Sequence, residues 1–324
     1  MKFIQTLMRV IACAALTISA AQAQDNFPSK TIRWVVPFSA GGGSDALARI
    51  VGGQMSIQMG QQFVIDNRPG GAAIIGTDAV AKSPGDGYTV LTADNGSLVF
   101  NTALFKSLPY NPQKDFTPVG LMVKFPLLLV VNPATGYNTA EQLISDMRKN
   151  PNKLGYGTAG VGSPHHIAME MLKERAKFEV THVAYKGAAP AIQDVIAGQI
   201  PMMVVDTAAG MQMIKAGKLK VLATFSKTRL ATLPTVPTLM ELGYTDTEAV
   251  AWQGLVAPAS TPAAIVQKLG SEMQKAINTP SVKARLLELG LEPVASDAAG
   301  MTSQWNHDAN LWPKLIRQRG ISLD

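Results

Sequence analysis

Short apolar runs alternate with amphipathic segments along almost the whole chain, and this alternation constrains the fold more than any other feature. Several runs are apolar at every position, as expected of strands covered on both faces. Strands that alternate with helices favour an α/β architecture with mostly parallel sheets. The predicted strands are residues 32–36, 63–65, 89–92, 127–131, 180–183, 202–205 and 221–225. The predicted helices are residues 44–59, 139–150, 164–175, 190–197, 262–277 and a long segment from about 297.

The first 23 residues have the three parts of an export signal. A short basic start with Lys2 and Arg9 is followed by an apolar run of about a dozen residues, which ends in Ala21-Gln22-Ala23. The run is too short to span a bilayer as a retained helix. We expect cleavage after Ala23 and export to the periplasm. No later stretch approaches 18 uninterrupted apolar residues, so the mature chain is expected to be soluble.

The only cysteine, Cys13, lies inside this segment. Residues 10–13 loosely imitate a lipoprotein cleavage box, but Arg9 directly before them leaves no apolar region upstream. After cleavage the chain has no cysteine, which excludes disulfides, thiolate metal sites and cysteine nucleophiles. About 300 residues remain, enough for two domains stabilised by their cores alone.

The charge balance is mildly basic, with 29 Lys and Arg against 23 Asp and Glu. Without Lys2 and Arg9 the mature chain carries 27 against 23, a net charge of +4. The basic residues are scattered, with no run longer than Arg148-Lys149 and no aromatic-rich basic stripe. We therefore expect no nucleic-acid partner. The positive balance is compatible with a small anionic ligand.

Two extended apolar segments, residues 116–131 and 249–258, are interpreted as crossings between two lobes. The signal peptide is then residues 1–23, lobe 1 is residues 24–124 plus 253–324, and lobe 2 is residues 125–252. A double crossing forms a hinge, and the cleft between the lobes becomes the natural ligand site.

The most informative single stretch runs from an apolar strand through Gly41-Gly42-Gly43 into the helix predicted from Ser44. The free N–H groups at a helix start carry partial positive charge, and glycines let a carboxylate oxygen approach the backbone closely. Asp45 is expected there as a cap or as an acceptor facing the ligand. A tight turn that binds nothing is the plain alternative.

Nucleotide binding is the competing interpretation of these glycines. A phosphate-binding P-loop fails because no lysine follows them. Gly41-x-Gly43-x-x-Ala46 does satisfy the dinucleotide fingerprint, and Asp66 ends the next strand where a ribose-binding carboxylate belongs. Against this, residues 37–40 separate the strand from the glycines, and export takes the chain away from a nicotinamide pool.

A second stretch, Tyr156 to His166, again predicts a strand, a glycine-rich loop and a helix, with Pro164 in the first helical turn. Two such loops, one from each lobe, could hold two ends of one dianion. Lys186 follows another strand end, where it could pair with a ligand carboxylate or remain a solvated loop lysine. Asp206 also ends a strand, and because it would repel an anion we expect it to orient the ligand rather than attract it.

The catalytic and metal-binding interpretations of the same region have less support from the sequence. Ser163, His166 and Asp206 could form a hydrolase triad, but Ser163 is followed by proline and lies in no Gly-x-Ser-x-Gly sequence. His166 and Glu170 are four residues apart on a predicted helix, yet no third metal ligand stands in an obvious place. We expect no catalytic residues and no metal.

Nine segments in order resemble one family. They are "PSKTIR" with "VPFSAGGGSD", "NRPGG", "SPGDGYTVL", "LPYNPQKDFTPV", "LGYGTAGVGSPHH", "HVAYKGAAPAIQDVIAGQI" and "AGKLKVLA" with "LPTVPTL". Together they closely resemble the periplasmic substrate-binding receptors of the tripartite tricarboxylate transporter family, also called Bug receptors, over essentially the whole mature chain. Ser39-Ala40 stands where many relatives carry prolines, which leaves the ligand identity open.

The resemblance implies a type II-like two-lobed periplasmic binding fold, with each lobe a mostly parallel sheet flanked by helices. It implies no catalysis and no cofactor, and a small carboxylate held largely by backbone amides and bridging waters. The partners are then that ligand and the membrane permease subunits, and we expect a monomer. The expected ligand-binding residues are Phe38, Ser39, Ala40, Gly41, Gly42, Gly43, Asp45, Asn95, Thr158, Ala159, Gly160, Val161, Gly162, His166, Tyr185, Lys186 and Asp206.

Two other functions remain open at this point. One is an exported enzyme, either a nucleotide-dependent oxidoreductase or a hydrolase. The other is a carboxylate sensor that signals instead of transporting, which the sequence does not distinguish from a transport receptor because the difference lies in the partner surface.

Overall fold

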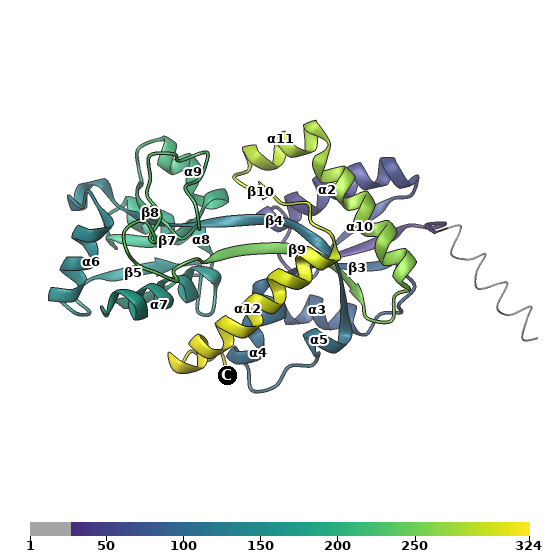
Figure 1. Ribbon diagram of the computed structural model, residues 1–324, viewed down its shortest axis with the longest axis horizontal. Helices are drawn as coiled ribbons and strands as arrows, with labels where there is room; N and C mark the ends of the chain where they lie inside the picture. The colour runs from purple at the N-terminus through teal and green to yellow at the C-terminus, as the bar shows by residue number, and fades with distance from the viewer. Residues whose placement is uncertain (1–26) are drawn as a thin grey trace, which may run out of the picture.

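The computed structural model describes residues 27–324, and Figure 1 shows two lobes joined by two long strands. The predicted signal peptide and its cleavage site lie outside the described residues. The strands are β1 Ile32–Val36, β2 Phe63–Asn67, β3 Thr89–Asp94, β4 Phe116–Val131, β5 Gly155–Thr158, β6 Thr181–Ala184, β7 Met202–Asp206, β8 Lys220–Thr224, β9 Val250–Pro258 and β10 Glu292–Pro293.

Helices cover both faces of the sheet, as predicted for this α/β chain. They are α2 Gly43–Met59, α3 Ile74–Ala81, η1 Gly96–Phe100, α4 Asn101–Leu104, α5 Pro112–Asp115, η2 Pro133–Thr135, α6 Ala140–Lys149, α7 Pro164–Ala176, α8 Ala188–Ile196, α9 Thr207–Lys215, α10 Ala263–Asn278, α11 Pro280–Glu288 and α12 Ala298–Gln318.

Lobe 1 contains β1, β2 and β3, lobe 2 contains β5 to β8, and the long strands β4 and β9 run between the lobes (Figure 1). Parallel pairing joins β1 to β2 and β3, and β5 to β6 and β7, because a helix carries the chain back between successive strands. The pairings of β4 with β7, β8, β9 and β10, and that of β3 with β9, are antiparallel. The two-lobed fold is thus as predicted, with parallel strands outside and antiparallel strands at the centre.

Strand β4 is shared by the two lobes. Its first part, from Phe116 to Pro126, pairs with β9, and its last part, from Leu127 to Val131, pairs with β7 and β8. Both segments interpreted as crossings are therefore extended strands. The lobe boundaries at residues 124/125 and 252/253 stay predictions, and the change of partners between Pro126 and Leu127 is the structural feature nearest to them.

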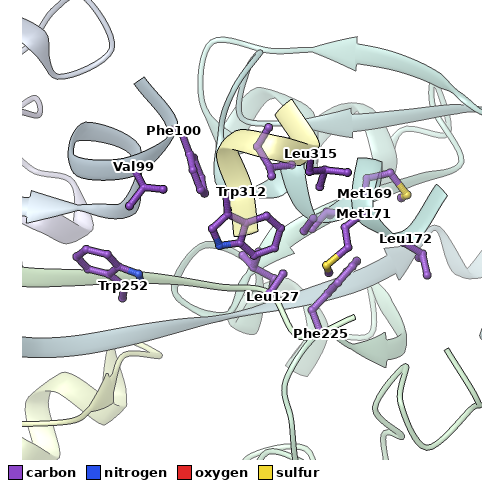
Figure 2. Close-up of a cluster of buried hydrophobic side chains, with 14 of the residues drawn as sticks. Val99, Phe100, Leu127, Met169, Met171, Leu172, Phe225, Trp252, Trp312 and Leu315 are labelled. Atoms are coloured by element: carbon purple, nitrogen blue, oxygen red, sulfur yellow. The ribbon is translucent and has the colours of Figure 1, made fainter. Parts of the chain in front are cut away.

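The two lobes share one hydrophobic core on the side of α12. Trp312 of α12 packs edge-on against Phe100 at 6.0 Å between ring centroids, and the same cluster continues to Met171 of α7 and to Leu127 of β4. Figure 2 shows Trp312 between these side chains. Trp252 of β9 is fully buried in this cluster and donates to Asp308 at 2.7 Å, so it is a packing residue.

Six helical segments are missing from the predicted set: α3, η1 with α4, α5, η2, α9 and α11. Two of them contain an internal glycine, which weakens a helical pattern. A Cβ on Gly76 of α3 would lie 2.8 Å from the Cβ of Pro37, and one on Gly210 of α9 would lie 2.9 Å from Val205 Cγ1. These glycines allow close packing on the sheet, a requirement that the local sequence does not reveal.

A partly buried ion-pair network holds the end of α12 against lobe 2. Arg319 donates to Glu170 at 2.6 Å and to Glu179 at 3.1 Å, and Lys173 pairs with the same two carboxylates at 2.8 and 3.0 Å. Burial alone would raise the pKa of Glu170, but Lys173 and Arg319 hold that pKa below its usual value. Glu170 is therefore a charged anchor for α12.

Removal of the Arg319 charge should destabilise the protein. Arg319→Met leaves buried Glu170 with one cation instead of two, and we expect a loss of about 2–3 kcal/mol in the free energy of unfolding. Urea denaturation measures this loss. Arg317→Met, on the exposed side of the same helical turn, is the matched control and should change stability by less than about 0.5 kcal/mol. Equal stability of the two variants would contradict this role of Arg319.

Candidate functional site

Strand polarity directs the two glycine-rich loops towards each other. In lobe 1, β1 and β3 run in the same direction as the first part of β4, towards lobe 2. In lobe 2, β5 and β7 run against the last part of β4, towards lobe 1. Loop 1 (residues 38–43) and loop 2 (residues 159–163), which follow β1 and β5, therefore open onto the space between the lobes.

Loop 1 presents bare backbone at the start of α2. Residues 39–43 are all exposed, and no side chain of the described residues caps the helix at Gly42. The first helical bond runs from the Ala46 N–H to the Gly42 carbonyl, so the amides of Gly43 and Ser44 precede it. A helix start of this kind favours an anion.

The glycines of loop 1 serve different purposes. Gly41 has φ +82°, a conformation that L side chains rarely adopt. Gly42 has φ −83°, which any residue accepts, and a Cβ there would meet only the Ser39 carbonyl at 3.6 Å. Gly42 is therefore required by no contact within the described structure, and the space above it is open for a ligand.

Asp45 does not cap the helix, contrary to one of its two predicted roles. Its Oδ2 accepts from the Gly41 N–H at 2.9 Å and from Arg49 Nε at 3.0 Å, and the residue is buried. Burial alone would raise its pKa, but these hydrogen bonds hold the pKa of Asp45 below its usual value. The charged side chain folds loop 1 back on itself and leaves the helix start uncovered. Phe38 is half-buried and its carbonyl accepts from Asn67 at 3.1 Å.

Loop 2 is shaped by its own hydrogen bonds. The buried Thr158 hydroxyl lies 3.2 Å from both the N–H and the carbonyl of Gly160, and Ser163 donates to that carbonyl at 2.7 Å. Ser163 also caps α7 by accepting from the His166 N–H. Ala159 and Gly160 are half-exposed and Val161 is exposed, whereas Gly162 is buried against lobe 1. A Cβ on Gly162 would lie 2.6 Å from Leu104.

Three aromatic rings stack beneath loop 2. His166 and His182 lie 3.9 Å apart between centroids at 12°, and Tyr156 stacks on the other face of His182 at 5.0 Å. His166 Nδ1 accepts from the Gly162 N–H at 3.1 Å, and His182 Nε2 lies 2.6 Å from the Thr158 hydroxyl. Burial lowers the pKa of both histidines to about 4, and each imidazole is therefore neutral near pH 7. His166 supports the loop from behind.

Asp206 has hydrogen-bond partners within lobe 2. It caps α9 by accepting from the Ala209 N–H at 2.8 Å, and its Oδ2 lies 3.0 Å from His165 Nε2. Burial alone would raise its pKa, but the His165 contact and the helix amide hold the pKa of Asp206 below its usual value. A carboxylate with its own partners repels an approaching anion less than a free one.

The remaining predicted residues differ in whether their polar groups already have partners within the protein. Asn95, buried at the end of β3, donates to the Val250 carbonyl at 3.1 Å. Tyr185 donates to Asp194 of α8 at 2.6 Å, so its hydroxyl is engaged inside lobe 2. Lys186 is exposed beside loop 2 and makes no ion pair with any described residue.

Sequence reasoning missed Ser44 and Gln253. Gln253 of β9 is buried and its Nε2 donates to the Ser44 hydroxyl at 2.5 Å, in the first turn of α2. The two residues are 209 positions apart, so no local pattern joins them. A signal was nevertheless present, because Gln253 is the only side chain with a strong hydrogen-bonding group besides Trp252 in the apolar strand from Val250 to Pro258.

The geometry disfavours the catalytic and nucleotide-binding alternatives. Asp206 contacts His165 and not His166, and Ser163 is engaged as a helix cap, so the triad is not assembled. Asp66 is ion-paired with Arg33 and Arg68 at 2.7 and 2.8 Å. Residues 27–324 contain no group of three His, Cys, Asp or Glu side chains placed to hold a metal ion. Within the same residues no helix is long and apolar enough to cross a bilayer.

A separate groove between the lobes does not include loop 1 or loop 2. It has a volume of about 390 Å³ and is lined by residues such as Met211 of α9, Leu287 of α11 and Thr207, the neighbour of Asp206. We place the candidate site at the loops instead, because uncapped amides occur there and mixed charges line the groove.

The comparisons with known proteins identify the family. The model of the tripartite tricarboxylate transporter family receptor matches residues 47–321. This chain belongs to that family. A protein of the tcbD–tcbE intergenic region of Pseudomonas sp. (strain P51) is 39% identical to this receptor over 95% of this chain and 93% of its own length. Protein BugT of Bordetella pertussis is 30% identical over 97% and 96%.

Solved structures agree with this assignment. R. palustris Rpa4515 with adipate superposes with a TM-score of 0.82 at 33% identity, covering 92% of this chain and 100% of that one. MatC from Rhodopseudomonas palustris with bound malate gives 0.78 at 30% identity, covering 90% and 100%. The periplasmic binding protein BugD gives 0.79 at 31%, covering 91% and 99%. The receptor therefore has the fold of a periplasmic solute-binding protein.

The histidine stack predicts a pH dependence of stability. An unfolded histidine titrates near pH 6.5, whereas His166 and His182 titrate at about 4 in the folded receptor. Between these values the unfolded chain binds more protons, so stability falls as the pH is lowered from about 6.5 to 4. Each histidine contributes a slope of up to about 1.4 kcal/mol per pH unit. Urea denaturation at pH 7, 6 and 5 measures the slope.

The double variant His166→Gln/His182→Gln should flatten this slope, whereas His307→Gln, on an exposed face of α12, should retain it. Asp94 and Asp308 act in the opposite direction, because burial raises the pKa of each carboxyl in the folded state. Asp94 and Asp308 are unchanged in the double variant, so its difference from the wild type measures the contribution of His166 and His182. Equal slopes in the two variants would contradict the neutral stack.

Proposed function

We propose that this receptor captures a small mono- or dicarboxylate outside the cytoplasm and delivers it to a tripartite tricarboxylate-type permease, without catalysis. The single observation that carries the proposal is the uncapped, exposed start of α2 at Gly42 and Gly43. Strand polarity supports it, because it directs loop 1 and loop 2 towards the same side of each lobe. Backbone amides there can donate to a carboxylate at little reorganisation cost. The family and its adipate- and malate-bound relatives support the same ligand class.

In this proposal the amides of loop 1 hold one end of the ligand and loop 2 closes on the other. The two lobes, with the boundaries predicted at residues 124/125 and 252/253, hinge on β4 and β9. Contacts from both loops are available together only in the closed form, so the ligand favours closure. Lys186 adds a positive charge beside loop 2, and Asp206 with His165 orients the ligand without holding a free negative charge.

A valine at position 42 tests the proposed anion site. Gly42→Val places two methyl groups in the open space above the helix start, where the carboxylate would lie, and its φ of −83° is compatible with valine. We expect carboxylate binding to weaken at least about 100-fold, because charge-assisted hydrogen bonds are lost, while the melting temperature without ligand changes little. Calorimetry and thermal shift against a carboxylate panel that includes adipate and malate measure both.

Gly53→Val is the matched control for this experiment. Gly53 is exposed on the same helix, and a Cβ there would contact nothing within 4 Å. It should bind ligand as the wild type does. Ligand-induced stabilisation that is equal in Gly42→Val and wild type would contradict the site. Stabilisation by nicotinamide dinucleotides in place of carboxylates would favour the enzyme alternative.

Export is tested at the N-terminus. We expect the protein purified from the periplasmic fraction to begin at Gln24, because Ala21-Gln22-Ala23 is a signal-peptidase site. Intact-mass spectrometry measures the start directly, and Ala23→Pro should block processing. Recovery of an uncleaved chain in the cytoplasmic fraction would contradict periplasmic delivery.

A further inference from the structure

A buried amide lies directly against the start of α2. Gln253 is only 6% exposed, and its Nε2 donates to the hydroxyl of Ser44, the second residue of the helix. Its other amide atom, Oε1, is buried and has no hydrogen-bond partner in residues 27–324. Native structures leave few buried acceptors without a partner, and such a group in a candidate site indicates a donor supplied from outside the chain.

The strand register places this amide beneath loop 1. Gln253 of β9 is opposite Val123 of β4, and Phe125, two residues further along β4, is on the same face. A Cβ on Gly43 would lie 3.8 Å from the Phe125 ring. The two strands that cross between the lobes therefore provide an apolar ring and a polar amide below the first turn of α2. A ligand bound at this turn would meet both.

The direction of the hydrogen bond determines which ligand groups fit. Ser44 accepts from Gln253, so its own proton is free to donate to a carboxylate oxygen at the helix start. The Gln253 carbonyl oxygen can only accept, and a carboxylate has no proton to give it at neutral pH. A hydroxyl or an ammonium group attached close to the ligand carboxylate would satisfy it.

We propose that Gln253 is a specificity-determining residue, and that the ligand carries a hydrogen-bond donor on the carbon next to the carboxylate held by α2. The inference rests on the proposed function and narrows its ligand class to 2-hydroxy or 2-amino acids. In this proposal Ser44 contacts the carboxylate, which every ligand has, and Gln253 contacts the substituent, which only some ligands have. The two residues should therefore affect affinity differently.

Calorimetry with matched acids tests this division. The probes are propionate, lactate and alanine; succinate, malate and aspartate; and adipate, 2-hydroxyadipate and 2-aminoadipate. In the length series that binds, the wild type should bind at least one substituted acid at least about 10-fold more tightly than the unsubstituted acid. The better of the hydroxyl and ammonium forms identifies the donor. Gln253→Met, which keeps the length but not the amide, should reduce the ratio to about 1.

Ser44→Ala should instead weaken all members of a series by a similar factor and keep their ratio. Gln267→Met, on the exposed side of α10, is the control for the Gln-to-Met change and should leave both affinity and ratio as in the wild type. If the wild type binds substituted and unsubstituted acids with nearly equal affinity, the inference is wrong. This outcome needs no variant, so the test remains valid even if Gln253→Met does not fold. A ratio retained in folded Gln253→Met also overturns it.

The failure of this inference and that of the proposed function give different results. If carboxylates bind without preference for a substituent, the receptor function stands and the role of Gln253 is wrong. If no acid in the three series binds to the wild type, the proposed function fails and this inference fails with it.

Discussion

The antiparallel pairing of β4 with β9 is the constraint on which the rest of the structure depends. Because these two strands carry the chain between the lobes, they fix the direction of every strand that pairs with them. Their direction turns the carboxyl ends of β1 and β3 towards lobe 2, and those of β5 and β7 towards lobe 1. In the proposed site, two glycine-rich loops from distant parts of the sequence therefore face one space, and Phe125 and Gln253 of the crossing strands lie against the first turn of α2.

The acidic side chains near the proposed site have different kinds of partners in the two lobes. In lobe 1 the Asp45 carboxylate is turned back onto Gly41 and Arg49, which leaves the positive end of α2 uncovered. In lobe 2 the carboxylates of Asp206 and Glu170 are each paired with a basic side chain or a histidine, and neutral imidazoles support the loop. In the proposed site an anion thus meets backbone donors, whereas the nearby acidic groups already have partners.

Local signals were sufficient for some elements and insufficient for others. Strand β1 was predicted to the residue and α2 to within one residue, because an apolar run and a glycine cluster mark both ends of the turn. The helices α3 and α9 were missed because Gly76 and Gly210 are present for packing against the sheet, which depends on tertiary contacts. The fold-back of Asp45 and the Ser44–Gln253 bond were likewise inaccessible, since each depends on where another segment lies.

Backbone amides at the start of α2 are the proposed ligand-binding groups. A crystal structure of the receptor with a bound carboxylate tests this claim most directly. We predict a ligand carboxylate oxygen within about 3 Å of the Gly43 or Ser44 amide nitrogen, with loop 2 against the opposite end of the ligand. A carboxylate bound instead in the groove between α9 and α11, with the start of α2 facing water, would contradict the account.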